Sequence, residues 1–331
     1  MIALRHRTRC ARLTAAVLLA FVLAIGPATA GTVRIGVLKF GTVAWELDVI
    51  EAHELDKAEG FDLEVVELAG KDATTVALQA GEVDVIVTDW IWVSRQRADG
   101  ADLTFVPYST AVGGVMVPAD SDIHSLADLE GKRLGIAGGP VDKSWLILRA
   151  LAERRHGMDL AATVEEVFGA PPLLNQQILL GRIDAVINYW NYMAQLEAEG
   201  FRTVVGVEEA ARELGISPDL PLLGYVFDES WADAHRDDVL AFVRASRRAK
   251  ELLLESDSEW ERLRPIVRAP DEATFRALRE GFRRGIPTKW GEAERASAER
   301  AFALMAELGG EKLVGNSREL QAGTFWPHVT Y

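Results

Sequence analysis

Large aromatic side chains gather at four places in the sequence, each directly after a run of small aliphatic residues that is typical of a buried strand. Such side chains bind flat or cationic ligands by stacking and cation–π contacts, and soluble proteins rarely expose them in clusters without a function. A single tryptophan is as often part of a core as of a binding site. The equivalent positions of Trp45, Trp90, Trp145 and Trp190 favour a binding site for these four, which Phe40 and Tyr189 would complete. Trp90 and Trp190 are expected to face each other across this site.

Polar groups at the same four places allow two ligand chemistries. Thr42, Ser144 and the backbone at Gly138 lie at the amino ends of expected helices, where N–H and hydroxyl groups favour an anion. Asp89 and Asp142 favour a cation instead, because a buried carboxylate needs a cationic or donor partner.

The role of these two carboxylates stays open between a ligand contact and a structural role. Lys39 and Lys143 lie at the same expected strand ends and could neutralise them. Asp142 could equally cap the helix that follows it, since aspartate is among the best residues for that position.

No residue pattern indicates catalysis. The histidines after residue 30 are His53, His124, His156, His235 and His328, and their spacing is not that of a metal site. No G-x-S-x-G turn, phosphate-binding loop or G-x-G-x-x-G motif occurs. We therefore expect no catalytic residue, no metal and no cofactor.

The elements that must position the aromatic residues form a repeat. The phrase GEVDVIVTDW at 81–90 returns as GRIDAVINYW at 181–190, and each phrase closes a series of alternating strands and helices. The first series has expected strands at 32–38, 62–68 and 83–89 with helices at 43–60 and 72–81. The second has strands at 132–138, 163–169 and 183–189 with helices at 143–157 and 173–181. Asp84 and Asp184 start the last strand of each series and are expected to serve the scaffold.

This pattern predicts an α/β protein of two lobes, each with a mostly parallel sheet and helices on its faces. The chain would cross between the lobes at 103–122 and again near Tyr225. The expected bounds are 31–115 with 222–331 for the first lobe and 116–221 for the second. The helical remainder, from about residue 237, is expected to complete the first lobe. Ligands bind beyond the carboxyl ends of parallel strands, which is where the aromatic residues lie.

The first 30 residues resemble a secretory signal, with four arginines, an apolar run at 13–25 and small residues before a cleavage site after Ala30. The only cysteine, Cys10, lies in this leader. The chain carries 50 acidic against 36 basic residues, which makes nucleic acid and anionic membranes poor partners. No later apolar run has the length of a membrane span, so we expect an exported protein that is not embedded in a membrane.

Several stretches resemble the periplasmic solute-binding proteins of ABC importers, in the nitrate/sulfonate/taurine-type family that also contains binders of thiamine-pyrimidine precursors. The stretches are VRIGVLKFGT, ALQAGEVDVIVTD, DIHSLADLEGKRLGIAGG, LLGRIDAVINYW and EAEGF, and the resemblance covers about residues 33–225. The most specific residues are Ile123, Ser125, Leu126, Asp128, Leu129, Gly131 and Lys132, which match the family's phrase opening the second lobe. The resemblance implies a type II binding-protein fold, a periplasmic location, and delivery of a small ligand to a membrane permease driven by an ATPase.

On this basis we expect a monomeric protein that captures a small organic ligand between its lobes, with an aromatic, heterocyclic or cationic amine part. The remaining expected ligand contacts are Ser109, Thr110, Asn188 and Tyr225. The four tryptophans depart from what sulfonate binders usually offer, and a sulfonate or taurine-type ligand is the alternative. Two other classes stay open: an accessory partner of a periplasmic enzyme, and an enzyme on the same fold.

Overall fold

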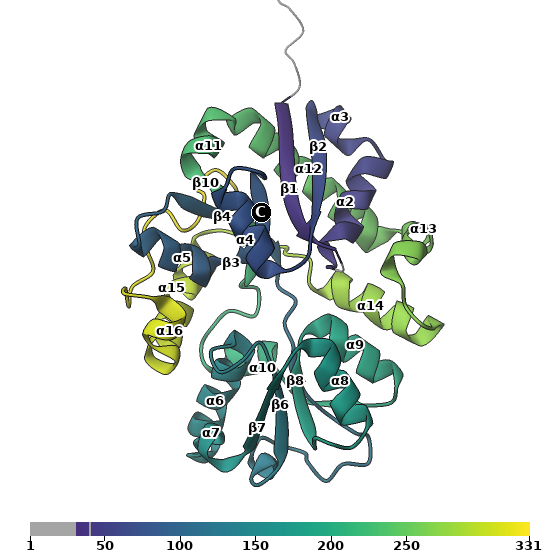
Figure 1. Cartoon of the computed structure of the whole chain (residues 1–331), viewed down its shortest axis with the longest axis vertical. Helices are drawn as coiled ribbons and strands as arrows, with labels where there is room; N and C mark the ends of the chain where they lie inside the picture. The colour runs from purple at the N-terminus through teal and green to yellow at the C-terminus, as the bar shows by residue number, and fades with distance from the viewer. Residues whose placement is uncertain (1–30, 40) are drawn as a thin grey trace, which may run out of the picture.

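The structure is a computed structural model that describes residues 31–39 and 41–331. The expected signal at 1–30 lies outside the described residues. Figure 1 shows two lobes, one above the other, each built around one sheet. The first sheet contains β1 (Gly31–Leu38), β2 (Phe61–Leu68), β3 (Val85–Asp89), β4 (Leu103–Ser109) and β10 (Leu223–Asp228). The second contains β5 (Gly114–Val117), β6 (Arg133–Ala137), β7 (Glu165–Gly169), β8 (Ala185–Asn188) and β9 (Arg202–Gly206).

The strand order is the same in both sheets and confirms the expected fold class. It reads β2-β1-β3-β10-β4 in the first and β7-β6-β8-β5-β9 in the second. β1 pairs in parallel with β2 and β3, as β6 does with β7 and β8. β10 and β5 run antiparallel to both of their neighbours, so the sheets are mixed. Each antiparallel strand is the first that the chain forms after crossing from the other lobe.

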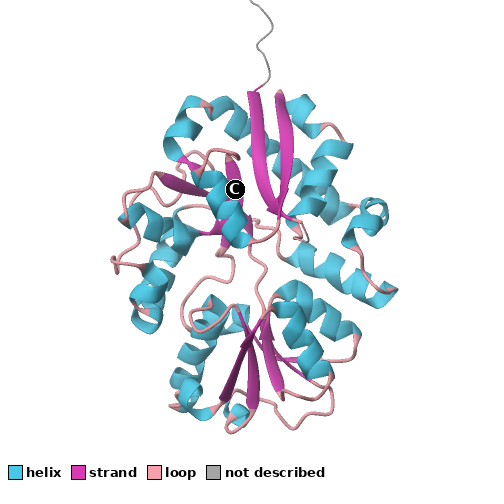
Figure 2. Cartoon of the chain, in the orientation of Figure 1, coloured by secondary structure: helices cyan, strands magenta, loops and turns pink. Residues whose placement is uncertain are grey.

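Helices cover both faces of the two sheets (Figure 2). Those of the first series are α2 (Val43–Ala52), α3 (Leu55–Glu59), α4 (Lys71–Gln79) and α5 (Trp90–Ala98). The second lobe has the 3₁₀ helix η1 (Ala127–Leu129), α6 (Lys143–His156), α7 (Leu160–Thr163), α8 (Pro171–Leu179), α9 (Trp190–Ala198) and α10 (Val207–Glu213). The single helix expected at 43–60 is wrong, because Glu54 adopts a left-handed conformation with φ of 49° and separates α2 from α3. None of the helices in the described ranges combines the length and apolar character that a membrane crossing requires.

The repeat reflects a shared ion pair that ties the first strand of each series to the start of its third. The Arg34 guanidinium donates to both Asp84 oxygens at 2.6 and 3.0 Å, and Arg133 donates to both Asp184 oxygens at 2.8 and 3.2 Å. Each aspartate also accepts the backbone N–H of its arginine, at 2.9 and 2.8 Å. Bidentate pairs of this kind fix geometry as well as energy, which confirms the scaffold role expected for Asp84 and Asp184.

The C-terminal helices reach both lobes. They are α11 (Glu229–Ala234), α12 (Arg236–Glu255), α13 (Asp257–Val267), α14 (Glu272–Arg284), α15 (Glu292–Gly309) and α16 (Glu311–Val314). α12 packs against β1, α2 and α3 of the first lobe, whereas α14 packs on α9 and α15 on α6 of the second. The C-terminal helices therefore pack against both lobes.

The crossing between β4 and β5 is short. β5 begins at Gly114 and pairs only with strands of the second sheet, so the boundary expected after residue 115 falls inside a strand. The crossing itself is 110–113, and the return crossing lies between α10 and β10.

Candidate functional site

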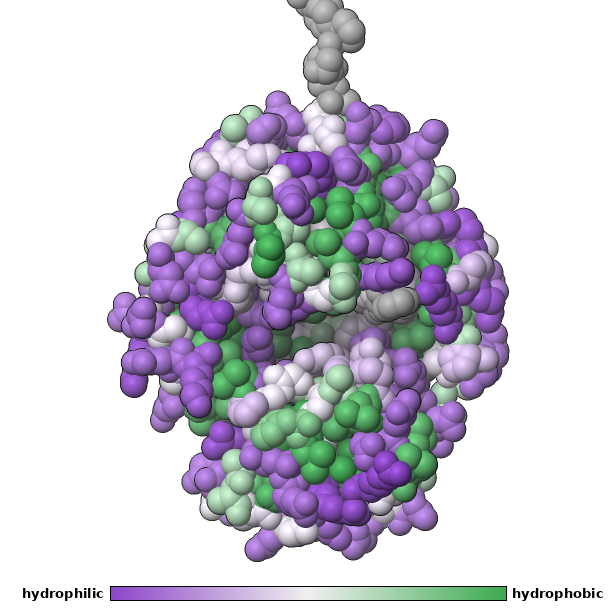
Figure 3. Space-filling view, viewed as in Figure 1, coloured by the Kyte–Doolittle hydropathy of each residue, from purple (hydrophilic) through white to green (hydrophobic). Residues whose placement is uncertain are grey.

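The lobes meet where the parallel strands end, and an ion pair joins them there. Figure 3 shows the surface hollowed between the two lobes. The Asp89 carboxylate, at the end of β3, accepts hydrogen bonds from Lys143 of the second lobe at 2.8 Å and from Lys71 of the first at 3.3 Å. It also caps α5 by accepting the Trp92 N–H at 2.8 Å. Asp89 is 4% exposed, and an unpaired carboxylate buried to this extent would be unfavourable. These three contacts stabilise its charged form.

The two lysines decide the charge of Asp89. Burial by itself would raise the pKa of Asp89, but Lys143 and Lys71 outweigh it and hold that pKa well below its usual range. Burial also disfavours the charged form of Lys143, and Asp89 reverses this and raises the Lys143 pKa. Asp89 is therefore ionised, and lysines of the protein balance its charge. This is the structural alternative that the sequence analysis left open, although with Lys71 in place of Lys39.

Asp142 caps α6, which confirms the capping interpretation. Its Oδ1 accepts the N–H groups of Ser144 at 2.9 Å and Trp145 at 3.2 Å. Burial raises the pKa of Asp142, with Lys143 and the two N–H groups acting in the opposite direction. A carboxylate with a raised folded pKa binds its proton more tightly when folded, so lowering the pH through that pKa stabilises the folded state.

We expect Asp142→Asn to keep the cap and lose this pH dependence. The amide oxygen caps as well as a carboxylate, whereas Asp142→Ala should cost about 1 kcal/mol of stability. Urea unfolding in steps from pH 7 to pH 4, towards the ordinary pKa of an aspartate, measures both effects: the wild type should gain stability on acidification relative to the asparagine variant. Equal pH profiles for the wild type and Asp142→Asn would contradict the burial argument.

Tyr189 and Gly138 lie beside this cap. Burial, followed by the nearby Asp142 charge, raises the pKa of Tyr189, whose side chain nevertheless remains 37% exposed. Gly138 has φ of 82°, and a Cβ there would lie 2.5 Å from Asp142 Oδ2 and 2.6 Å from the Tyr189 hydroxyl oxygen. Both the backbone conformation and the space therefore require glycine.

Trp45 and Trp190 meet across the lobes. Their rings pack edge to face with centroids 6.3 Å apart, and Trp45 also contacts Trp260 and Phe282 of the C-terminal helices. Trp190 is only partly buried and lies against Gly281 of α14, where a Cβ would be 2.8 Å from its ring. The four aromatic residues pack together at the meeting of the lobes, where Trp45, Trp260 and Phe282 are buried and Trp190 is partly exposed.

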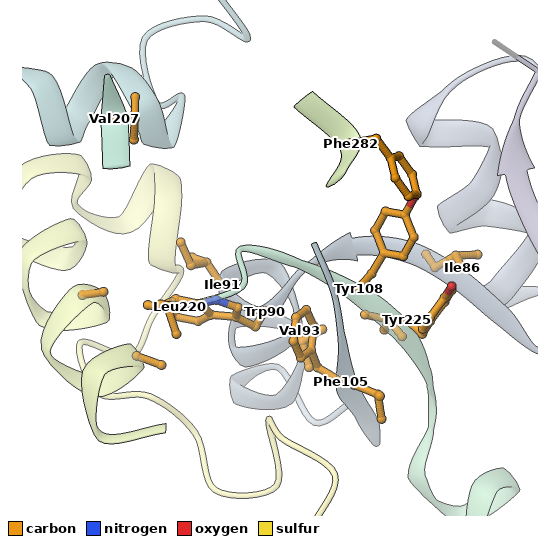
Figure 4. Packing of buried hydrophobic residues seen from close by; sticks show 14 of the residues in the cluster. Ile86, Trp90, Ile91, Val93, Phe105, Tyr108, Val207, Leu220, Tyr225 and Phe282 are labelled. Carbon is orange, nitrogen blue, oxygen red and sulfur yellow. The ribbon is translucent and has the colours of Figure 1, made fainter. Parts of the chain in front are cut away.

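The expectation that Trp90 and Trp190 face each other across a cleft is wrong. Trp90 is fully buried in the first lobe, donates its indole N–H to the Pro221 carbonyl at 3.0 Å, and packs against Phe302 and Phe325. Figure 4 shows its ring close to Leu220 in the buried cluster. The helix α5 begins at Trp90 and directs the ring into the core. Trp145 is likewise 1% exposed, with Arg149 stacked 5.8 Å from its ring centre.

Four other expected contacts have structural partners. The Asn188 amide donates to the Pro171 carbonyl and to Asn175 Oδ1, and its oxygen accepts the Tyr189 N–H. At the crossing, the Ser109 hydroxyl and the Thr110 N–H both donate to the Gly285 carbonyl. Tyr225 is 1% exposed and donates to Glu46.

Three expected ligand contacts remain: Thr42, Ser144 and Phe40. Thr42 lies just before α2, and Ser144 lies in the first turn of α6 and is only 8% exposed. Phe40 lies outside the described residues.

The sequence analysis missed residues that complete the meeting of the lobes. Lys71 opens α4, directly after β2, and its position at a strand end is a signal that could have been used. Trp260 and Phe282 come from the C-terminal helices α13 and α14. The periodicity of these segments predicts that they are helical but does not show which residues they pack against. In the described ranges, no group of three or more His, Cys, Asp and Glu side chains is arranged to hold a metal ion.

Comparison with known proteins agrees with this architecture. The chain is similar to the aliphatic sulphonate-binding protein SsuA from Escherichia coli, with 18% identity, a TM-score of 0.70, and coverage of 89% of this chain and 97% of that one. The alkanesulfonate-binding protein SsuA from Xanthomonas axonopodis pv. citri, bound to MOPS, matches with 20% identity and a TM-score of 0.66 over 90% of this chain and 99% of the other.

An enzyme shares the same fold. The desulfurization enzyme DszB matches with 16% identity and a TM-score of 0.56 over 89% of this chain and 97% of its own. At these identities the three matches show the fold alone, and no curated protein matches the sequence. A family model described as "NMT1/THI5 like" matches residues 56–259, which is more than half of the chain. The chain belongs to the NMT1/THI5-like family.

Proposed function

We propose that this protein is the solute-binding component of an ABC importer and captures a small organic ligand where its lobes meet. The observation that carries the proposal is the joining of the two lobes, along the carboxyl ends of their strands, by the Lys143–Asp89 ion pair and the Trp45–Trp190 contact. Within residues 31–39 and 41–331, two segments cross between the lobes, so ligand binding would shift a population between separated and closed lobes.

The charges at the site favour the sulfonate-type alternative over a cationic amine. Asp89 is already paired with two lysines, and Asp142 caps a helix, so neither carboxylate is free for an ammonium group. Lys71 is the more loosely held of the two lysines, since its ammonium lies 3.3 Å from Asp89 and its side chain is 56% exposed, so it can turn towards an acid group. A ligand with an acid group and an apolar or aromatic body would fit these lysines and the Trp45–Trp190 contact, and the similar SsuA proteins are sulfonate binders.

Delivery to a membrane permease with its ATPase follows from this role, as do a periplasmic location and the cleavage expected after Ala30. The second candidate class is an enzyme, because DszB shares the fold. Turnover of a bound ligand by the purified protein would favour that class.

Tryptophan fluorescence tests the proposal. We expect a sulfonate such as ethanesulfonate or benzenesulfonate to change the emission of the wild type, and Trp45→Phe or Trp190→Ala to weaken its binding about tenfold, or ~1.4 kcal/mol. Trp231→Phe is the matched control, since Trp231 lies on α11, away from the crossings, and contacts Phe227 of β10 and His235. Pyrimidines and amines complete the panel of ligands.

Two results would count against the proposal. If no ligand class changes the emission, the capture of a small molecule is unsupported. If a ligand binds the wild type, Trp45→Phe and Trp190→Ala with the same affinity, the site lies elsewhere.

A further inference from the structure

A cavity of about 310 Å³ lies at the two crossings, and of its described lining residues only Trp190 also belongs to the proposed site. Its walls come from α14 of the first lobe, from α9 and the start of α10 of the second, and from the crossings themselves. The crossing residues that line it are Thr110, Ala111, Val112, Gly113, Pro218 and Asp219. Of its described lining residues, none belongs to β3 or to the loops at 39–44 and 138–145, where the proposed ligand would bind. Its volume is at the lower end of that of small-molecule sites, about 300–1,000 Å³.

Two of the carboxylates that line the cavity are balanced by neighbours outside it. Glu208 accepts a hydrogen bond from Arg212 at 2.7 Å, and Asp219 accepts one from Lys289 at 2.9 Å. These pairs remove most of the excess negative charge from the lining.

Two opposite charges remain. Arg284, on α14, and Glu197, on α9, both line the cavity. In the part of the chain that the structure describes, neither side chain forms an ion pair or hydrogen bond, with each other or with any other residue. Trp190 forms part of the same wall, where its ring can contact a cation.

We propose that this cavity is a second ligand site, for a small zwitterion such as an amino acid. The acid group would bind the Arg284 guanidinium, which presents a planar fork suited to an acid, and the amino group would bind the Glu197 carboxylate. Because Arg284 belongs to the first lobe and Glu197 to the second, an occupied cavity would tie the lobes together and favour their closed arrangement. A zwitterion satisfies both charges at once, whereas a ligand with one charge leaves the other unpaired.

Calorimetric titration of the full chain with β-alanine and 4-aminobutanoate tests this site. We expect both zwitterions to bind the wild type at least tenfold more tightly than propionate and propylamine. Arg284→Gln and Glu197→Gln should each weaken binding about tenfold or more, which is the size of a lost hydrogen bond to a charged group. The matched controls Arg276→Gln on α14 and Glu199→Gln after α9 lie outside the lining and should bind within twofold of the wild type.

The proposal fails if neither zwitterion binds the wild type, or if Arg284→Gln and Glu197→Gln bind them as tightly as the controls do. All four substituted side chains are exposed, so the variants are expected to fold. Trp45 does not line the cavity. Trp45→Phe should therefore leave zwitterion binding unchanged while it weakens sulfonate binding, which separates a failure of this site from a failure of the proposed function.

Discussion

Lys250→Met is expected to lower the free energy of unfolding by about 3–5 kcal/mol, the cost of removing one partner from a buried ion pair. The Lys250 ammonium lies 3.3 Å from Glu46 Oε2, and both side chains are buried in the first lobe, Glu46 completely. The variant leaves the Glu46 carboxylate in the core with the Tyr225 hydroxyl, which donates to Oε1 at 2.5 Å, as its remaining strong partner.

The surroundings of Lys250 show why the charge matters to this lobe. Its ammonium lies 4.6 Å from the ring centre of Tyr108 and 5.3 Å from that of Tyr225, and it donates to Ser246 at 3.2 Å. Burial lowers the pKa of Lys250, and Glu46 acts against that shift. The cluster joins α2, α12, β4 and β10, and so holds the strand that leads into the first crossing and the strand that follows the second.

Urea unfolding of a double-mutant cycle measures the pair. Glu46→Gln should also destabilise the protein, and the double variant Glu46→Gln/Lys250→Met should recover much of the loss, because neither charge is then left alone. Lys289→Met is the control on the surface: its pair with Asp219 is largely exposed and should contribute less than about 1 kcal/mol. Strictly additive single effects would mean that the two charges do not interact.

Lys143→Met is expected to separate the lobes. Asp89 is paired with two lysines, and this substitution removes the one that belongs to the second lobe. Truncating a buried charge partner costs about 2–5 kcal/mol, which is enough to change the ratio of closed to separated lobes by a factor of ten or more. Small-angle scattering should show a larger radius of gyration, and hydrogen exchange should become faster at the start of α6.

Lys71→Met is a matched control for this experiment. It removes a lysine from the same carboxylate, but Lys71 belongs to the first lobe, so the lobes should stay together. If both variants expand equally, a general loss of stability explains the result, and the Lys143–Asp89 ion pair does not hold the lobes together.

The Asp89 pKa sets the pH dependence of the same contact. An aspartate whose folded pKa is depressed contributes stability that is complete above its unfolded pKa and is lost as the pH falls towards the folded value. The wild-type lobes should therefore remain joined at pH 4, where an ordinary aspartate begins to protonate. Expansion already at pH 5 would contradict this assignment.

The repeat made the architecture predictable. Each series alternates a short aliphatic run with an amphipathic stretch, and these local patterns are sufficient to place three strands and to predict two lobes. The positions of Asp84 and Asp184 at the start of equivalent strands also identified them as scaffold residues. Their partners Arg34 and Arg133 could not be assigned, because a contact across 50 or 51 residues leaves no local pattern.

The binding site was less predictable, and Trp90 and Trp190 show why. Both open the helix that follows the last strand of their series, so the sequence treats them alike. In the first lobe the C-terminal helices and the final segment surround Trp90, through Phe302 and Phe325, and bury it completely. In the second lobe Trp190 lies against Gly281 of α14 but stays partly exposed, and its ring meets that of Trp45.

The sequence by itself thus determined the two α/β lobes, the crossings between them and the strand ends at which they meet, because periodicity and turn residues act locally. Only the tertiary structure decided which aromatic and charged side chains face the other lobe. Which side chains do so depends on packing by the C-terminal helices, which follow both repeats in the chain, and on the ion pairs of Asp89 with Lys71 and Lys143. These contacts join residues that are far apart in the sequence.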